Sequence, residues 1–97
     1  MKRDELIAKL RQVAPAIKAE GVTGLAIFGS RARGDARDDS DLDLLIEVDA
    51  PRFSLLNLIG VEHIAADATG LRSQAAMRRS LDPGFAERIA DDIIKVF

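Results

Sequence analysis

The chain of 97 residues contains no cysteine, no tryptophan and no tyrosine, and it has only four phenylalanines. The absence of cysteine excludes disulfide bonds and thiolate metal sites, and it is typical of a protein in the reducing cytoplasm. So few aromatic rings leave no platform on which nucleic-acid bases could stack. The net charge of −2 also has the wrong sign for a domain whose main task is to bind nucleic acid. We therefore expect a cytoplasmic protein without direct nucleic-acid binding.

Long apolar runs are missing as well. No segment approaches the roughly 20 apolar residues that a bilayer-spanning helix needs. The first ten residues, MKRDELIAKL, place charges among the apolar positions and so lack the apolar stretch of a secretory signal. We expect no contact with membranes. The composition, 47% hydrophobic and 31% charged, is typical of a globular fold, and the length predicts a single domain over residues 1–97.

Hydrophobic periodicity predicts helices that alternate with short strands. Apolar residues recur at helical spacing over residues 3–19, where Pro15 should kink or divide the helix. The further predicted elements are a strand over 22–28, a short helix and turn over 30–39, a strand over 40–48, a helix over 53–68, a weak strand over 72–77 and an amphipathic helix from Asp82 to the C-terminus. This order predicts an α/β (α+β) domain in which a small mixed β-sheet has helices packed on one face.

The strand over residues 40–48 carries two aspartates, Asp41 and Asp43, at its start. Side chains two residues apart on a strand leave the same face, and their Cα atoms lie about 6.5–7 Å apart. Two such carboxylates repel each other, and a divalent cation reverses that cost. Mg²⁺ prefers oxygen ligands and usually retains water and substrate phosphate oxygens in its shell. An acidic pair taken alone is more often solvated surface, but this pair indicates a site for one or two Mg²⁺ ions of the kind used in phosphoryl chemistry.

Gly29 and Ser30 end the preceding strand and begin the predicted short helix. Glycine permits a tight turn and a close backbone approach, and the free N–H groups at a helix start suit a phosphate. The ten residues between Ser30 and Asp41 are enough for a short helix and a return to a neighbouring strand. The two strands would thus bring a phosphate site beside the metal site. We take Asp41 and Asp43 as candidate catalytic residues and metal ligands, and as candidate nucleotide-binding residues Gly29, Ser30, Arg31 and Ser40.

The stretch FGSRARGDARDDSDLDLL, residues 28–45, closely resembles the motif of DNA polymerase β-like nucleotidyltransferases, in which Gly-Ser, a ten-residue spacer and Asp-x-Asp follow one another. The Ala-Arg-Gly after Gly-Ser, the Ser-Asp that leads into the acidic pair and the small size resemble one branch of that superfamily. This branch is the minimal nucleotidyltransferase (MNT) antitoxins, which are paired with HEPN ribonuclease toxins. The resemblance covers most of the chain, and two sub-motifs at a fixed spacing are far more specific than a lone Asp-x-Asp.

The resemblance implies an enzyme that moves AMP from ATP to an acceptor hydroxyl and releases pyrophosphate. It implies that Asp41 and Asp43 coordinate Mg²⁺ and that Gly29 and Ser30 hold the phosphates of the nucleotide. In the MNT branch the acceptor is a tyrosine of the cognate HEPN toxin, and its modification silences the toxin. Because this chain has no tyrosine, such an acceptor must lie on another protein. We expect a hetero-oligomer with the toxin or a homodimer.

One position departs from the family pattern. The family supplies a third carboxylate from a strand after the middle helix, and alignment on Gly70 places that position at Gln74, a neutral amide that cannot serve as a base. The chain is therefore either an active but weakened adenylyltransferase or an inactive one that neutralises its toxin by binding alone. Transfer of a nucleotide to RNA or to a small molecule is a third alternative, which the acidic charge and the short chain disfavour.

Overall fold

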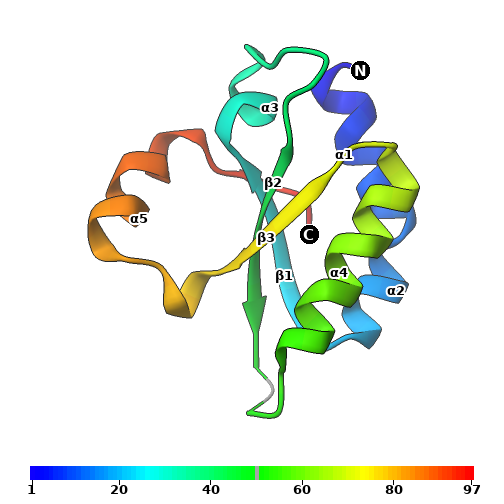
Figure 1. Cartoon of the computed structure of the whole chain (residues 1–97), viewed down its shortest axis with the longest axis vertical. Coiled ribbons are helices and arrows are strands. Elements are labelled where there is room, and N and C mark those ends of the chain that lie inside the picture. The colour runs from blue at the N-terminus through cyan, green and yellow to red at the C-terminus, as the bar shows by residue number, and fades with distance from the viewer. Residues whose placement is uncertain (50) are drawn as a thin grey trace.

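The computed structural model describes residues 1–49 and 51–97, and it consists of a β-sheet with helices on both sides (Figure 1). Its elements are, in chain order, α1 (Arg3–Gln12), α2 (Ala14–Ala19), β1 (Val22–Phe28), α3 (Gly29–Arg33), β2 (Leu42–Val48), α4 (Leu55–Thr69), β3 (Ser73–Met77), the 3-10 turn η1 (Arg78–Ser80), α5 (Pro83–Ile89), the 3-10 turn η2 (Ala90–Asp92) and β4 (Ile94–Lys95). Within the described ranges, no helix has both the length and the apolar character needed to cross a membrane.

The four strands form one mixed sheet in the order β3-β2-β1-β4. β1 is antiparallel to both β2 and β4, whereas β2 and β3 are parallel. A parallel pair needs a crossover connection, and α4 provides it between β2 and β3. The predicted fold class, a small mixed sheet with helices, is therefore confirmed, and the weak strand predicted over 72–77 exists as the edge strand β3.

The first predicted helix is divided, as Pro15 indicates. α1 ends at Gln12 and α2 begins at Ala14, with Pro15 in the first turn of α2, where its missing N–H costs no helix hydrogen bond. The break changes the direction of the chain, and Leu10 and Ile17 are both fully buried on either side of it.

Three helices, α1, α2 and α4, cover one face of the sheet (Figure 1). Side chains alternate along β2, because Leu44 and Ile46 lie in this core whereas Leu45 belongs to a separate cluster on the opposite face. The largest fully buried side chains of this core are Leu6, Leu10, Ile17, Leu25, Ile27, Leu42, Leu44, Ile46 and Val61.

The opposite face carries a smaller cluster beneath α5. The Phe85 ring of α5 meets the Phe28 ring of β1 edge to face, with centroids 5.9 Å apart. The prediction of one helix from Asp82 to the C-terminus is wrong in its second half, because α5 ends at Ile89 and the chain then forms η2 and β4. The predicted packing of helices on one face holds for α1, α2 and α4, whereas α5 packs on the other face. In the final segment, Ile93 packs against the smaller cluster, whereas Ile94, Val96 and Phe97 belong to the main core.

Candidate functional site

The candidate site lies where β1 ends and β2 begins, at the upper end of the sheet in Figure 1. Phe28, the last residue of β1, pairs with Asp43 of β2. The next residue, Gly29, has a φ of 75° and lies directly against the Asp43 carboxylate, since a Cβ atom on Gly29 would stand 2.5 Å from Oδ2 of Asp43. Both the backbone conformation and the close approach require glycine here. The structure thus brings Gly29 and Asp43 together, and their roles stay predictions.

Asp41, just before β2, is held by two side chains from the β3 edge. The Nε atom of Arg72 donates a hydrogen bond of 2.7 Å to Oδ1 of Asp41, and Nε2 of Gln74 donates one of 3.0 Å to Oδ2. The Asp41 side chain is 25% exposed, whereas that of Arg72 is 78% exposed. Asp41 is therefore oriented by donors on both of its oxygens, one of which is a largely solvated cation.

Gln74 lies beside the two aspartates, at the position where alignment with the family pattern predicts a carboxylate. β2 and β3 are parallel and pair Asp43 with Gln74, so these two side chains leave the same face of the sheet. Although Gln74 stands opposite Asp43, its amide donates to Asp41. Among residues 1–49 and 51–97, no cluster of three or more acidic, histidine or cysteine side chains could hold a metal ion. The site therefore offers two carboxylates and one amide.

Asp43 is the carboxylate of the site whose pKa is raised. Burial is the largest cause that raises the pKa of Asp43 above its ordinary value, and the neighbouring Asp41 charge raises it further, while Arg33 lowers it. Asp43 is thus less well compensated in its ionised form than Asp41, which has two donors. A cation placed between the two carboxylates would relieve both the burial cost and the repulsion. Their oxygen donors fit a hard divalent ion such as Mg²⁺.

Two of the predicted nucleotide-binding residues shape the loop that leads into β2. Arg31 is buried, and its guanidinium donates to the backbone carbonyls of Asp38 and Ser40 over 2.9–3.3 Å. The hydroxyl of Ser40 accepts a hydrogen bond of 2.8 Å from the backbone N–H of Arg37. A buried guanidinium is stable only when its donors are paired, so Arg31 fixes the segment that presents Asp41. Contact of either side chain with a nucleotide stays a prediction.

Ser30 follows Gly29 in α3 and is half-buried. Its backbone carbonyl accepts hydrogen bonds from the N–H groups of Gly34 and Asp35, which close this short helix. The structure therefore keeps Ser30 at the corner beside Gly29, where the sequence predicts it, and its contact with phosphate stays a prediction.

Arg33, at the end of α3, is a charged neighbour of the site. Its Nη1 atom donates to Asp92 over 3.0 Å, and its Nε atom donates to Asp35 over 3.2 Å. The hydrogen bond with Asp92 is the largest cause that raises the pKa of Arg33, and its positive charge lowers the pKa of Asp43. Arg33 thereby connects the site to the C-terminal segment.

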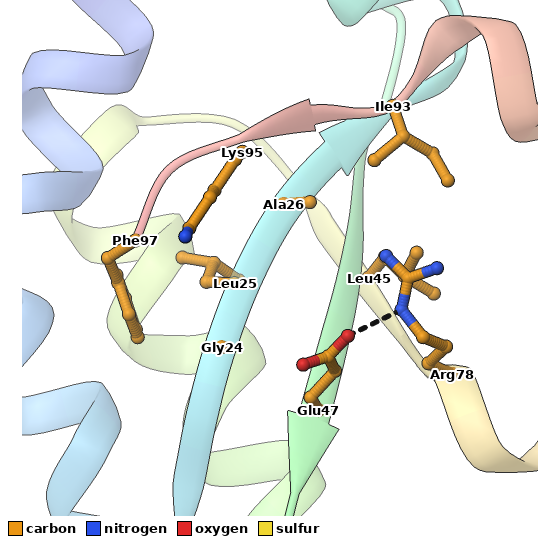
Figure 2. A pocket seen from close by; sticks show the side chains of 9 residues that line it. All are labelled: Gly24, Leu25, Ala26, Leu45, Glu47, Arg78, Ile93, Lys95 and Phe97. Carbon is orange, nitrogen blue, oxygen red and sulfur yellow. Dashed lines mark ion pairs between the residues drawn. The ribbon is translucent and has the colours of Figure 1, made fainter.

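Two hollows differ in their relation to the aspartates. One of about 190 Å³ is lined by Asp41 and Arg72 together with the loop before β2 and the end of α4. The other, of about 200 Å³, lies farther along the sheet, where Ala26 and Leu45 form its floor and the ion pair between Glu47 and Arg78 lies at its rim (Figure 2). Only the first hollow is lined by a member of the acidic pair, so we assign it to the candidate site.

A comparison with protein families decides which family this chain belongs to. The sequence profile described as a nucleotidyltransferase domain matches residues 10–96. The chain belongs to this nucleotidyltransferase family. The protein adenylyltransferase MntA of Thermococcus cleftensis is 36% identical to this nucleotidyltransferase domain over 76 residues, which cover 78% of the chain and 76% of that protein.

Solved structures support the same assignment. One that is provisionally described as a minimal nucleotidyltransferase is 32% identical to this nucleotidyltransferase domain, with a TM-score of 0.81 and coverage of 97% of this chain and 95% of that one. A toxin–antitoxin with AMP-PNP has a TM-score of 0.70 at 16% identity, covering 100% of this chain and 73% of that chain. A complex of the tri-AMPylated HEPN toxin of Shewanella oneidensis with MNT antitoxin has a TM-score of 0.70 at 12% identity, covering 98% and 71%. The predicted resemblance to minimal nucleotidyltransferases is confirmed.

Proposed function

We propose that this nucleotidyltransferase domain is a Mg²⁺-dependent protein adenylyltransferase that moves AMP from ATP to a tyrosine hydroxyl of a partner HEPN toxin, and that it thereby acts as a cytoplasmic antitoxin. The family and the relative named a protein adenylyltransferase support the reaction type. The structural neighbours solved with AMP-PNP and with an AMPylated HEPN toxin support the nucleotide and the class of partner.

The close approach of Gly29 to Asp43 carries the proposal. Gly29 has no side chain, so the backbone at the start of α3 leaves the Asp43 carboxylate open at the corner. Asp41 lies on the same face two residues earlier and is already oriented by its donors. A triphosphate at this corner would lie beside both carboxylates, where a divalent cation held by them could neutralise its charge.

Each residue of the corner would have a separate role in the transfer of AMP. Asp41 and Asp43 would hold Mg²⁺, which when bound neutralises phosphate charge and favours departure of pyrophosphate. Gly29 and Ser30 would hold the phosphates, and Arg31 would keep the loop before Asp41 in place. The acceptor oxygen forms a bond to the α-phosphorus, the bond from that phosphorus to the bridging oxygen breaks, pyrophosphate leaves, and the hydroxyl proton passes to solvent.

A second function is favoured by Gln74. The amide contributes no negative charge and cannot accept a proton from an attacking hydroxyl. Arg72 also occupies one oxygen of Asp41. The chain would then neutralise its toxin by occupying the toxin surface without modifying it. Under this alternative, a variant that lacks both aspartates still protects cells from the toxin, whereas loss of protection with an intact complex would exclude it.

The enzyme proposal is tested with purified chain, the cognate toxin, Mg²⁺ and ATP labelled at the α-phosphate. We expect the label on the toxin, and we expect it to disappear in the variant Asp41→Asn/Asp43→Asn, which retains the shape of both side chains but removes their charge. Replacement of the acceptor tyrosine by phenylalanine on the toxin should also remove the label.

A matched control is the variant Asp67→Asn/Asp91→Asn, which removes the same charge from two exposed positions outside the site. It should label the toxin at the wild-type rate. A toxin that stays unlabelled by the wild-type chain, under conditions in which the two proteins form a complex, would refute the proposed activity.

A further inference from the structure

Two pairs of side chains face each other across β2 and β3. The register places Asp43 beside Gln74, and it therefore places Asp41 beside Arg72. The backbone bond of 2.8 Å from the N–H of Leu42 to the carbonyl of Arg72 fixes this alignment at the end of the strands. All four side chains leave the same face of the sheet, because Asp41 and Asp43 are two residues apart along one strand and Arg72 and Gln74 are two residues apart along the other.

Gln74 does not bond the aspartate opposite it. Its amide reaches diagonally and donates to Oδ2 of Asp41 over 3.0 Å. An amide N–H₂ group is a donor with no lone pair to offer a metal. The amide N–H₂ group of Gln74 therefore lies between Asp41 and the β3 backbone. The Asp43 carboxylate lies against Gly29 instead.

We propose that Gln74 is a positioning residue that orients Asp41 and restricts this site to a single divalent cation, held between Asp41 and Asp43. The inference rests on the proposed use of a cation by these two aspartates. A second ion would have to share Asp41 with position 74, where the amide presents hydrogen atoms in place of a carboxylate oxygen.

Arg72 and Gln74 act differently on Asp41. The Arg72 side chain is 78% exposed, so water can replace its hydrogen bond when a cation arrives. Gln74 is exposed as well, but it lies within β3, and the pairing with β2 sets its backbone position directly opposite Asp43. Arg72 thus balances the charge of Asp41 before a cation binds, whereas Gln74 keeps the carboxylate oriented afterwards. Hydrogen bonds of this kind to a ligating carboxylate typically change metal affinity by about 10–100-fold.

The inference is tested with Mn²⁺, which takes the same oxygen ligands as Mg²⁺. The purified chain is dialysed with Mn²⁺ and AMP-PNP, with free nucleotide on both sides of the membrane, and the bound ions are counted and examined by electron paramagnetic resonance. Two ions in a shared site lie about 3.5–4 Å apart and give a spin-coupled spectrum. We expect one bound ion and an uncoupled spectrum from the wild-type chain, and two ions and a coupled spectrum from Gln74→Glu.

The controls separate charge from position. Gln12→Glu makes the same chemical change at an exposed position on α1 and should retain one uncoupled ion. Gln74→Ala should also retain one ion, with affinity reduced by about 10–100-fold. A coupled spectrum from the wild-type chain, an uncoupled one from folded Gln74→Glu, or unchanged affinity in Gln74→Ala would overturn the inference. A wild-type chain that binds no Mn²⁺ would instead remove the cation site, and with it the proposed function.

Discussion

The two faces of the sheet differ although the same strands build both. Toward α1, α2 and α4, β2 presents Leu42, Leu44 and Ile46, which are all fully buried. Toward α5, the same strand presents Asp43 and Leu45, and the aspartate is only half-buried at the end of the cluster. Alternation along one strand thus separates the main core from the candidate site. A substitution on the face that α1, α2 and α4 cover should therefore change stability. A substitution at the corner formed by Gly29, Asp41 and Asp43 should change activity.

The largest effect should come from Leu44→Ala, on the face that α1, α2 and α4 cover. Removal of a fully buried leucine leaves a cavity and should lower the free energy of unfolding by about 2–5 kcal/mol. Urea denaturation followed by circular dichroism measures this loss. Glu47→Ala on the opposite face removes an exposed ion pair with Arg78 and should cost less than about 1 kcal/mol. Equal losses in the two variants would contradict the division between the faces.

The next effect concerns Asp43, which lies one residue before Leu44 and on the other face. Asp43→Asn should lower the rate of AMP transfer by about 10²–10³-fold, the usual cost of removing a group that stabilises charge in the transition state. Thermal melting should show no loss of stability. The single variant Asp67→Asn, at an exposed position of α4, is the charge-matched control. A destabilised Asp43→Asn chain with a normal rate per folded molecule would reverse the assignment of the two faces.

Two glycines provide a smaller and more specific comparison. Gly29 and Gly34 both have positive φ, 75° and 88°, so alanine should cost each about 1–2 kcal/mol of stability. A Cβ atom on Gly29 meets the Asp43 carboxylate, whereas one on Gly34 meets nothing within 4 Å. Gly29→Ala should therefore also reduce the transfer rate, by up to about 100-fold, because it displaces Asp43. Initial rates of toxin labelling are the measurement, and equal rates in both variants would exclude the close approach as a requirement.

The smallest effect is a dependence of stability on pH in the absence of divalent ions. Burial and Asp41 raise the pKa of Asp43 above its ordinary value of 3.8, so the folded chain binds this proton more tightly than the unfolded chain does. The ionised group therefore destabilises the fold, and the penalty develops as pH rises from the ordinary pKa through the raised one. Asp43→Asn should be more stable than the wild-type chain at neutral pH, and the difference should vanish below the ordinary pKa. Melting temperatures of both chains across acidic pH check the sign.

The fold could be predicted from the sequence where a periodic pattern is long enough to be recognised. β1 and α4 lie close to their predicted ranges, and Pro15 divides the first helix as its missing N–H requires. β4 could not be predicted, because two residues, Ile94 and Lys95, are too few to show a period of their own. Their strand exists because β1 offers a free edge to pair with.

The site could be predicted in part for the same reason. A spacing of two on a strand fixes a common face for Asp41 and Asp43, whatever the rest of the fold does. The partners of these residues depend on tertiary contacts that no local pattern encodes. The ion pair between Arg33 and Asp92 joins residues 59 positions apart, and the Arg72 contact with Asp41 spans 31 positions.

The central claim is that the corner formed by Gly29 and the two aspartates transfers AMP to a partner protein. The most direct measurement is the intact mass of the cognate toxin after co-expression with the wild-type chain or with Asp41→Asn/Asp43→Asn. We predict a toxin that carries one or more AMP units only with the wild-type chain. A toxin of unmodified mass with both chains, or one modified equally by both, would contradict the account.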